Sequence, residues 1–81
     1  MNSIVIFDIK IAADNLNLRL LEELKKRGNK AVRYSEILEY NNQFAIIVMK
    51  EDLHILTEEE EVRTSILDST NNFLKTIAEE N

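Results

Sequence analysis

The chain of 81 residues has no cysteine, no proline, no tryptophan, one glycine and one histidine. Without cysteine it forms no disulfide and no thiolate metal site, and one histidine excludes a zinc site built from several histidines of one chain. A domain this small buries little apolar surface, so its folding leaves little net stability. Since those two means of stabilisation are excluded, the sequence predicts association of two copies in a homodimer.

The sequence also lacks the segments that target or anchor a protein in a membrane. Its N-terminus has no basic segment followed by a long apolar one, as a signal peptide has. No apolar run approaches the roughly 20 residues of a membrane-spanning helix. We therefore expect a cytoplasmic protein without membrane contact. No linker, repeat or low-complexity tract divides the chain, which predicts a single α+β domain over residues 1–81.

Acidic residues are concentrated towards the C-terminus. Residues 1–56 contain eight acidic and eight basic side chains, whereas residues 57–81 contain seven acidic and two basic ones, so the second segment carries the whole net charge of −5. Proteins that bind duplex nucleic acid normally present a basic face. We therefore expect a protein partner with a basic surface rather than nucleic acid.

The N-terminal third of the chain predicts a strand followed by a helix. Residues 4–11, IVIFDIKI, are dense in β-branched side chains and have the length of a strand. Residues 13–28 show leucines at helical spacing, with Asp14 as the expected N-cap and Gly28 where a glycine commonly follows the last turn.

The middle of the chain predicts a pair of antiparallel strands at residues 30–40 and 44–49, joined by an asparagine-rich turn, because asparagine tolerates a positive φ. Residues 53–56 predict either a short strand or the approach to a last helix. Thr57 and Glu60 match a capping box, in which each side chain accepts a hydrogen bond from the backbone of the other residue.

The final helix is expected to run from about Glu58 to about Glu79. The resulting order, β-α-β-β-(β)-α, predicts an α+β fold of the ferredoxin-like, open-faced sandwich type, with two helices on one face of a small sheet. The helix between the first two strands forces a crossover, which we expect to be right-handed.

Apolar residues outnumber the positions that this arrangement would cover. In the first strand, Ile4 and Ile6 point to one face and Val5 to the other, as in strands covered on both faces. The final helix also shows a second apolar stripe, which includes Leu67 and Leu74. We therefore expect the homodimer interface to include the open sheet face or this second stripe.

Asp8 interrupts the first apolar run and shares the parity of Ile4 and Ile6, so we expect it on the sheet face that the helices leave open. Three interpretations are open. Asp8 is a solvated residue paired with Lys10 or Arg33, or it has a structural hydrogen-bonding role, or it is a metal-binding carboxylate at a dimer interface.

The third interpretation rests on a resemblance. In sequence order, Phe7–Asp8, Arg19, Gly28 and Tyr34–Ser35 resemble the first half of the CRISPR-associated spacer-acquisition nucleases, the small ferredoxin-fold partners of the integrase. The resemblance implies a metal-dependent nuclease in which Asp8 from two protomers holds Mg²⁺ or Mn²⁺, and the metal activates a water. The second half of the chain departs from this family, because it ends in an acidic helix instead of a strand.

The element order and the acidic end are also similar to the DNA-damage-inducible modulators of the RecA recombinase, whose acidic last helix imitates DNA. This resemblance implies a small regulatory protein without catalysis or cofactor. Phage-encoded inhibitors that imitate DNA fit the same description. At 100° per residue, Glu61, Asp68 and Glu79 would share one arc of the final helix. We expect binding through this acidic helix or through the apolar sheet face, with the metal-dependent nuclease as the alternative. The acids at residues 58–61 also have a local explanation, because the helix dipole favours carboxylates in a first turn.

Overall fold

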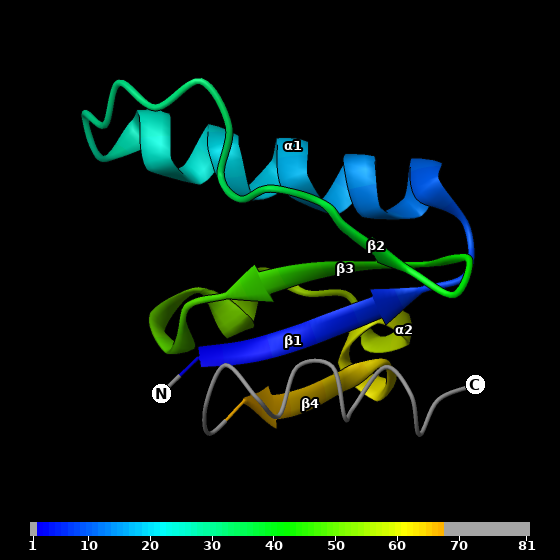
Figure 1. The fold of residues 1–81 in the computed structure, drawn as a ribbon. Helices are drawn as coiled ribbons and strands as arrows, with labels where there is room; N and C mark the ends of the chain where they lie inside the picture. The colour runs from blue at the N-terminus through cyan, green and yellow to red at the C-terminus, as the bar shows by residue number, and fades with distance from the viewer. Residues whose placement is uncertain (1, 68–81) are drawn as a thin grey trace.

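The computed structural model describes residues 2–67, which form a four-stranded antiparallel sheet with one long helix across one face (Figure 1). The elements are β1 (Asn2–Phe7), α1 (Lys10–Lys26), β2 (Leu38–Tyr40), β3 (Gln43–Val48), the 3₁₀-helix η1 (Lys50–Ile55), α2 (Glu58–Val62) and β4 (Thr64–Leu67). The strand order is β2-β3-β1-β4, so β1 lies between β3 and β4. The predicted α+β class is confirmed.

Strand β1 has apolar side chains at both parities, and both sets are buried. Val5 pairs with Ile46 of β3, and their side chains lie in the larger core with Leu16 of α1. On the opposite face Ile4 and Ile6, 0% and 4% exposed, form a second cluster with Ala45 and Leu38. These side chains are buried within one chain, so they do not require a second copy to cover them, and the homodimer stays a prediction.

The first predicted strand is too long and the first helix begins earlier than expected. The pairing of β1 with β3 ends at Phe7, and a bend at Asp8 and Ile9 leads directly into α1. Ile9 is the N-cap residue, so Asp14 lies one turn inside the helix instead of capping it. Periodicity failed here because a short, nearly continuous apolar run cannot be assigned to a strand or to a helix by periodicity alone.

Two turns were predicted correctly from single residues. At the end of α1, Gly28 has a φ of +84°, and the Asn29 N–H donates to the Leu24 carbonyl at 3.0 Å, as in a Schellman motif. Between β2 and β3, Asn41 and Asn42 have φ values of 51° and 62°, as the two central residues of a type I′ hairpin turn require. The expected antiparallel pairing of these strands is confirmed.

The predicted final helix is wrong at residues 63–67, and its remainder lies outside the described residues. Helix α2 has five residues, and β4 follows it and pairs antiparallel with β1. The second edge of β1 carries backbone groups that need hydrogen-bonding partners, and the β-branched residues Thr64 and Ile66 suit a strand. Residues 53–55 belong to η1 and Leu56 is its C-cap residue, so the alternative of a short strand there is also wrong.

Candidate functional site

The residues between α1 and β2 form an irregular segment, residues 29–37, which we call the connector. The connector runs back alongside α1 before it enters the sheet (Figure 1). The Asn17 side chain, 9% exposed, donates from Nδ2 to the Ser35 carbonyl at 2.5 Å and accepts the Tyr34 N–H at 3.1 Å. Because a helix side chain satisfies this backbone, the connector needs no strand partner, and the strand predicted over residues 30–37 does not form.

A second set of contacts fixes the other side of the connector. The Tyr34 hydroxyl donates to Asp52 Oδ2 at 2.6 Å and accepts the Met49 N–H at 3.1 Å. Arg27, at the end of α1, donates to Asp52 Oδ1 at 2.5 Å. The Asp52 side chain is 1% exposed, so one buried carboxylate joins the end of α1, the connector and η1.

This arrangement shifts two pKa values. Burial of Asp52 opposes its ionisation, but the hydrogen bonds from Tyr34 and Arg27 outweigh burial and lower the pKa of Asp52. Burial, together with the hydrogen bond to Asp52, raises the pKa of the Tyr34 hydroxyl far above its ordinary value. Tyr34 is therefore a protonated donor and Asp52 an ionised acceptor at neutral pH.

The connector and α1 enclose a groove of about 600 Å³, which we call the α1–connector groove. Both sides contribute aliphatic and polar side chains. The lining residues are Lys10, Asp14, Asn17, Leu18 and Leu21 from α1, and Val32, Arg33, Ser35 and Ile37 from the connector. Asn17 and Asp52 hold the connector beside the helix and so help to shape the groove.

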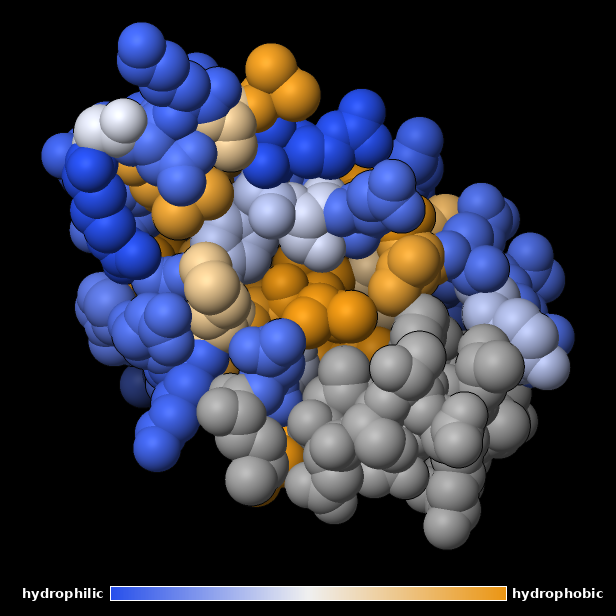
Figure 2. Space-filling view, turned by 60° about the vertical axis from the view of Figure 1, so that its left-hand side comes forward, coloured by the Kyte–Doolittle hydropathy of each residue, from blue (hydrophilic) through white to orange (hydrophobic). Residues whose placement is uncertain are grey.

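Aliphatic side chains of this groove are unusually exposed. Leu18 is 58% exposed and Val32 is 88% exposed, and they line the groove from opposite sides. Ile11, the second residue of α1, is 65% exposed as well, although it does not belong to the lining. Figure 2 shows that apolar side chains also gather in the middle of the face turned to the viewer, with hydrophilic side chains above and to the left of them. Exposed apolar surface that shares a concavity is typical of a binding site.

The groove contains two basic side chains that have no ion pair in the described part of the chain, as is also true of several other surface lysines. Arg19, Arg27 and Arg63 each form an ion pair with an acidic side chain. Within residues 2–67, neither Lys10 nor Arg33 forms an ion pair, although both line the groove. Among the described residues, Asp14 is the one acidic residue in the lining, so they give the groove more positive than negative charge.

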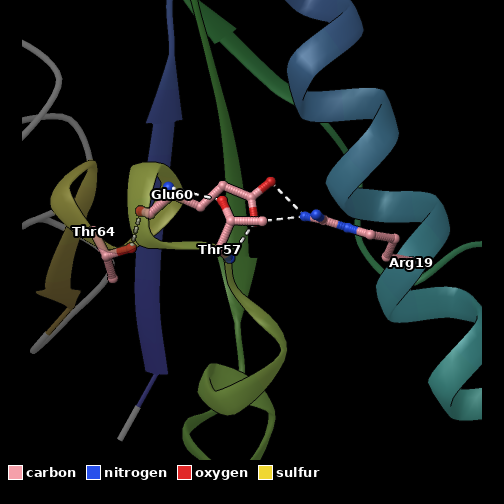
Figure 3. Close-up of polar contacts among 4 residues, drawn as sticks. All are labelled: Arg19, Thr57, Glu60 and Thr64. Atoms are coloured by element: carbon pink, nitrogen blue, oxygen red, sulfur yellow. Dashed lines mark hydrogen bonds and ion pairs between the residues drawn. The ribbon is translucent and has the colours of Figure 1, made fainter.

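The acidic helix α2 is joined to α1 by a network of polar contacts (Figure 3). The predicted capping box is confirmed, because Glu60 accepts the Thr57 N–H at 2.9 Å and donates its own N–H to the Thr57 hydroxyl at 3.2 Å. The Glu60 carboxylate also binds Arg19 through both oxygens, and the Thr64 hydroxyl donates to the Glu60 carbonyl at 2.7 Å. Glu60 is thus a structural residue, whereas Glu61 is exposed.

The predicted arc of acids and the second apolar stripe require one continuous helix, which α2 and β4 do not form. Glu61 lies in α2, and Leu67 is the last residue of β4 and pairs with Asn2. Asp68, Leu74 and Glu79 lie outside the described residues. The role predicted for these five residues in partner binding therefore stays a prediction.

Asp8 lies at the bend after β1, where its side chain is 67% exposed. It pairs with neither Lys10 nor Arg33. Its Oδ2 lies 3.7 Å from Arg63 Nη1, and its Oδ1 accepts a hydrogen bond from Gln43 Nε2 at 3.2 Å. Guanidinium and amide N–H groups are donors and not metal ligands, and within residues 2–67 no three side chains of histidine, cysteine, aspartate or glutamate lie together. The metal-binding role of Asp8 stays a prediction.

Comparison of the chain with protein-family models, with curated proteins and with solved structures gave no match. In the part of the chain that the structure describes, no helix combines the length and the apolarity needed to cross a bilayer. Function therefore has to be argued from the geometry of the domain itself.

Proposed function

We propose that the chain is a regulatory binding domain without a catalytic role, and that the α1–connector groove receives a segment of a protein partner. The observation that carries this proposal is the exposure of Leu18 and Val32 on opposite sides of one groove. Single exposed aliphatic residues are common on protein surfaces and need no explanation. Two that line the same concavity offer a partner apolar surface that is already shaped to receive it.

The way in which the connector is held supports a binding role. A partner that binds a flexible segment must first order it, which reduces the affinity. Here Asn17 fixes the connector backbone at Tyr34 and Ser35, and Asp52 fixes the Tyr34 side chain. Both sides of the groove are therefore arranged before a partner arrives, so less of the interaction energy is lost to ordering.

The groove is a better-supported binding surface than the two surfaces that the sequence suggested. Helix α2 has five residues, and Glu60 is occupied by Arg19. The second sheet face has Ile4 and Ile6 buried within the chain. The groove, in contrast, has exposed aliphatic side chains and basic residues without an ion pair in the described part of the chain.

The strand order supports a ferredoxin-like fold as part of this proposal. Two β-α-β units, β1-α1-β2 and β3-η1-α2-β4, interleave so that β1 and β3 lie in the centre of the sheet. In this arrangement α1 and the connector lie together beside the edge strand β2. Variation of the connector then changes the groove without changing the central strands.

Affinity capture from cells of the native host, with three forms of the full chain as bait, tests the proposal. The forms are the wild type, Val32→Asp and the matched control Val62→Asp, since Val62 is 84% exposed on α2 and does not line the groove. We expect at least one protein to be captured by the wild type and by Val62→Asp but not by Val32→Asp. Capture of the same proteins by all three forms, or of none by the wild type, would contradict the proposal.

A further inference from the structure

We infer that the α1–connector groove binds an extended peptide segment that carries aliphatic side chains between carboxylates. This inference rests on the proposed function and adds the chemistry of the partner. It differs from the expectation based on net charge, which was that this acidic chain binds a partner with a basic surface.

The charges of the groove are complementary to an acidic ligand. The whole chain has a net charge of −5, yet the groove is lined by Lys10 and Arg33 with Asp14 as the one acidic neighbour. Within residues 2–67 these two bases have no ion pair, whereas Arg27 and Arg63 are paired with acids of the same chain. Because Lys10 and Arg33 lie beside apolar surface and have no ion pair in the described residues, they favour a ligand that carries carboxylates.

The apolar surface of the groove is suited to aliphatic side chains of a peptide. Its side chains are aliphatic and come from both sides, namely Leu18 and Leu21 from α1 with Val32 and Ile37 from the connector. Among residues 2–67, no aromatic side chain lines the groove, so these residues offer no platform on which a nucleobase could stack, as single-stranded nucleic acid requires. Aliphatic peptide side chains fit this surface better.

The length of the groove along α1 fits a short extended peptide. The α1 residues of the lining extend from Lys10 to Leu21, about 16 Å along the helix at 1.5 Å per residue. An extended peptide covers this length with about five residues at roughly 3.3 Å each. Asn17 lies about 10 Å along α1 from Lys10. Because Asn17 binds the Tyr34 backbone, the preceding residue Arg33 lies near this level of the helix. Carboxylates about three positions apart would therefore reach both bases, with an aliphatic residue between them.

Selection from an unbiased display library of random 12-residue peptides tests the inference on the full chain. The targets are the wild type, Val32→Asp, the double variant Lys10→Glu/Arg33→Glu, and two controls, Val62→Asp and Lys50→Glu. Lys50 is exposed and lines a separate pocket with Leu53 and Ile66. The charge reversals should not harm folding, because a glutamate at the first position of α1 is favoured by the helix dipole and Arg33 is exposed.

We expect the selected peptides to share two acidic residues about three positions apart around a leucine, isoleucine or valine. A synthetic peptide of this type should bind the Lys10→Glu/Arg33→Glu variant at least about fivefold more weakly than the wild type, since two charge pairs are replaced by two repulsions. Its affinity for Lys50→Glu and Val62→Asp should change less than about twofold. High salt should reduce the difference between the double variant and the wild type.

The remaining outcomes separate this inference from the proposed function. Selected peptides that require Val32 but are basic or uncharged would overturn the inference and leave the binding groove standing. A selection without any Val32-dependent peptide would overturn both. If light scattering shows a dimer of the wild type that Val32→Asp dissociates, the occupant is a second copy and the inference is wrong. Binding of a labelled single-stranded oligonucleotide that Lys10→Glu/Arg33→Glu abolishes would also overturn it.

Discussion

The centre of the sheet and the connector are held in place by different kinds of interaction. Strands β1 and β3 pair over five residues, and their side chains are buried on both faces. The connector has no strand pairing over residues 29–37 and depends on two buried polar side chains, Asn17 and Asp52. The sheet is stabilised by many small contributions, whereas the position of the connector depends on a few hydrogen-bonding atoms. The candidate binding surface is thus built in the region that is most sensitive to single substitutions.

Asp52→Ala should produce the largest effect, because it leaves the Tyr34 hydroxyl and the Arg27 guanidinium without their buried acceptor. Removal of one partner of a buried ion pair costs about 3–5 kcal/mol. The Arg27 side chain is 41% exposed and can regain water, so we expect a loss of about 3 kcal/mol in the free energy of unfolding. Chemical denaturation measures it. The exposed neighbour Glu51→Ala should change stability by less than about 0.5 kcal/mol, and equal losses in both variants would contradict the account.

Asn17→Ala tests the other attachment of the connector. It leaves the Tyr34 N–H and the Ser35 carbonyl without their partner, and we expect a loss of about 2 kcal/mol, since each buried unsatisfied group costs about 1–3 kcal/mol and these are half-buried. Asn15→Ala is the matched control, because Asn15 is exposed on the same helix and alanine has the higher helix propensity. Amide hydrogen exchange should show faster exchange at Tyr34 in Asn17→Ala only. Unchanged exchange there would mean that Asn17 does not hold the connector.

The sequence predicted the local turns and caps better than the connector for a physical reason. The hairpin turn at Asn41 and Asn42, the end of α1 at Gly28 and the capping box depend on residues within a few positions of one another, so local patterns revealed them. Asn17 contacts residues 17 and 18 positions away, and nothing in its own neighbourhood indicates these partners. One signal was present, since an asparagine among the buried leucines of a helix needs hydrogen-bonding partners.

Strand β4 was missed for a similar reason. The spacing of Val62 and Ile66 fits a helix, and only the need of β1 for a partner on its second edge makes residues 64–67 a strand. Tertiary pairing of this kind overrides local propensity. The same limitation applies to the groove, because Lys10 and Arg33 lie 23 positions apart in the sequence and share a surface only after the connector folds back along α1.

The lowered pKa of Asp52 predicts a pH dependence with a definite sign. Since the carboxyl is more acidic in the folded than in the unfolded chain, its contribution to stability is present above the unfolded pKa, near pH 4, and is lost as the pH falls through the lower folded pKa. The free energy of unfolding should therefore fall as the pH is lowered below about 4. In Asp52→Asn this decline should be shallower. Parallel declines in both proteins would show that Asp52 is not the responsible group.

Asp8→Ala should have the smallest effect on stability, less than about 0.5 kcal/mol, because its side chain is exposed and its ion pair with Arg63 is long. The same variant tests the metal-dependent nuclease alternative. DNA cleavage by the wild type in Mg²⁺ or Mn²⁺ that is lost in Asp8→Ala would favour that alternative over a binding domain. We expect no cleavage by either protein.

The most direct test of the central claim is the map of amide chemical-shift changes on the ¹⁵N-labelled full chain when a library-selected peptide is added. The account predicts that the largest changes fall on both sides of the α1–connector groove, at residues 10–21 of α1 and 31–37 of the connector. It also predicts that the amides of α2 and β4 change little. Largest changes in α2, β4 or the second sheet face, with the groove unaffected, would contradict the claim that this groove is where the chain binds its partner.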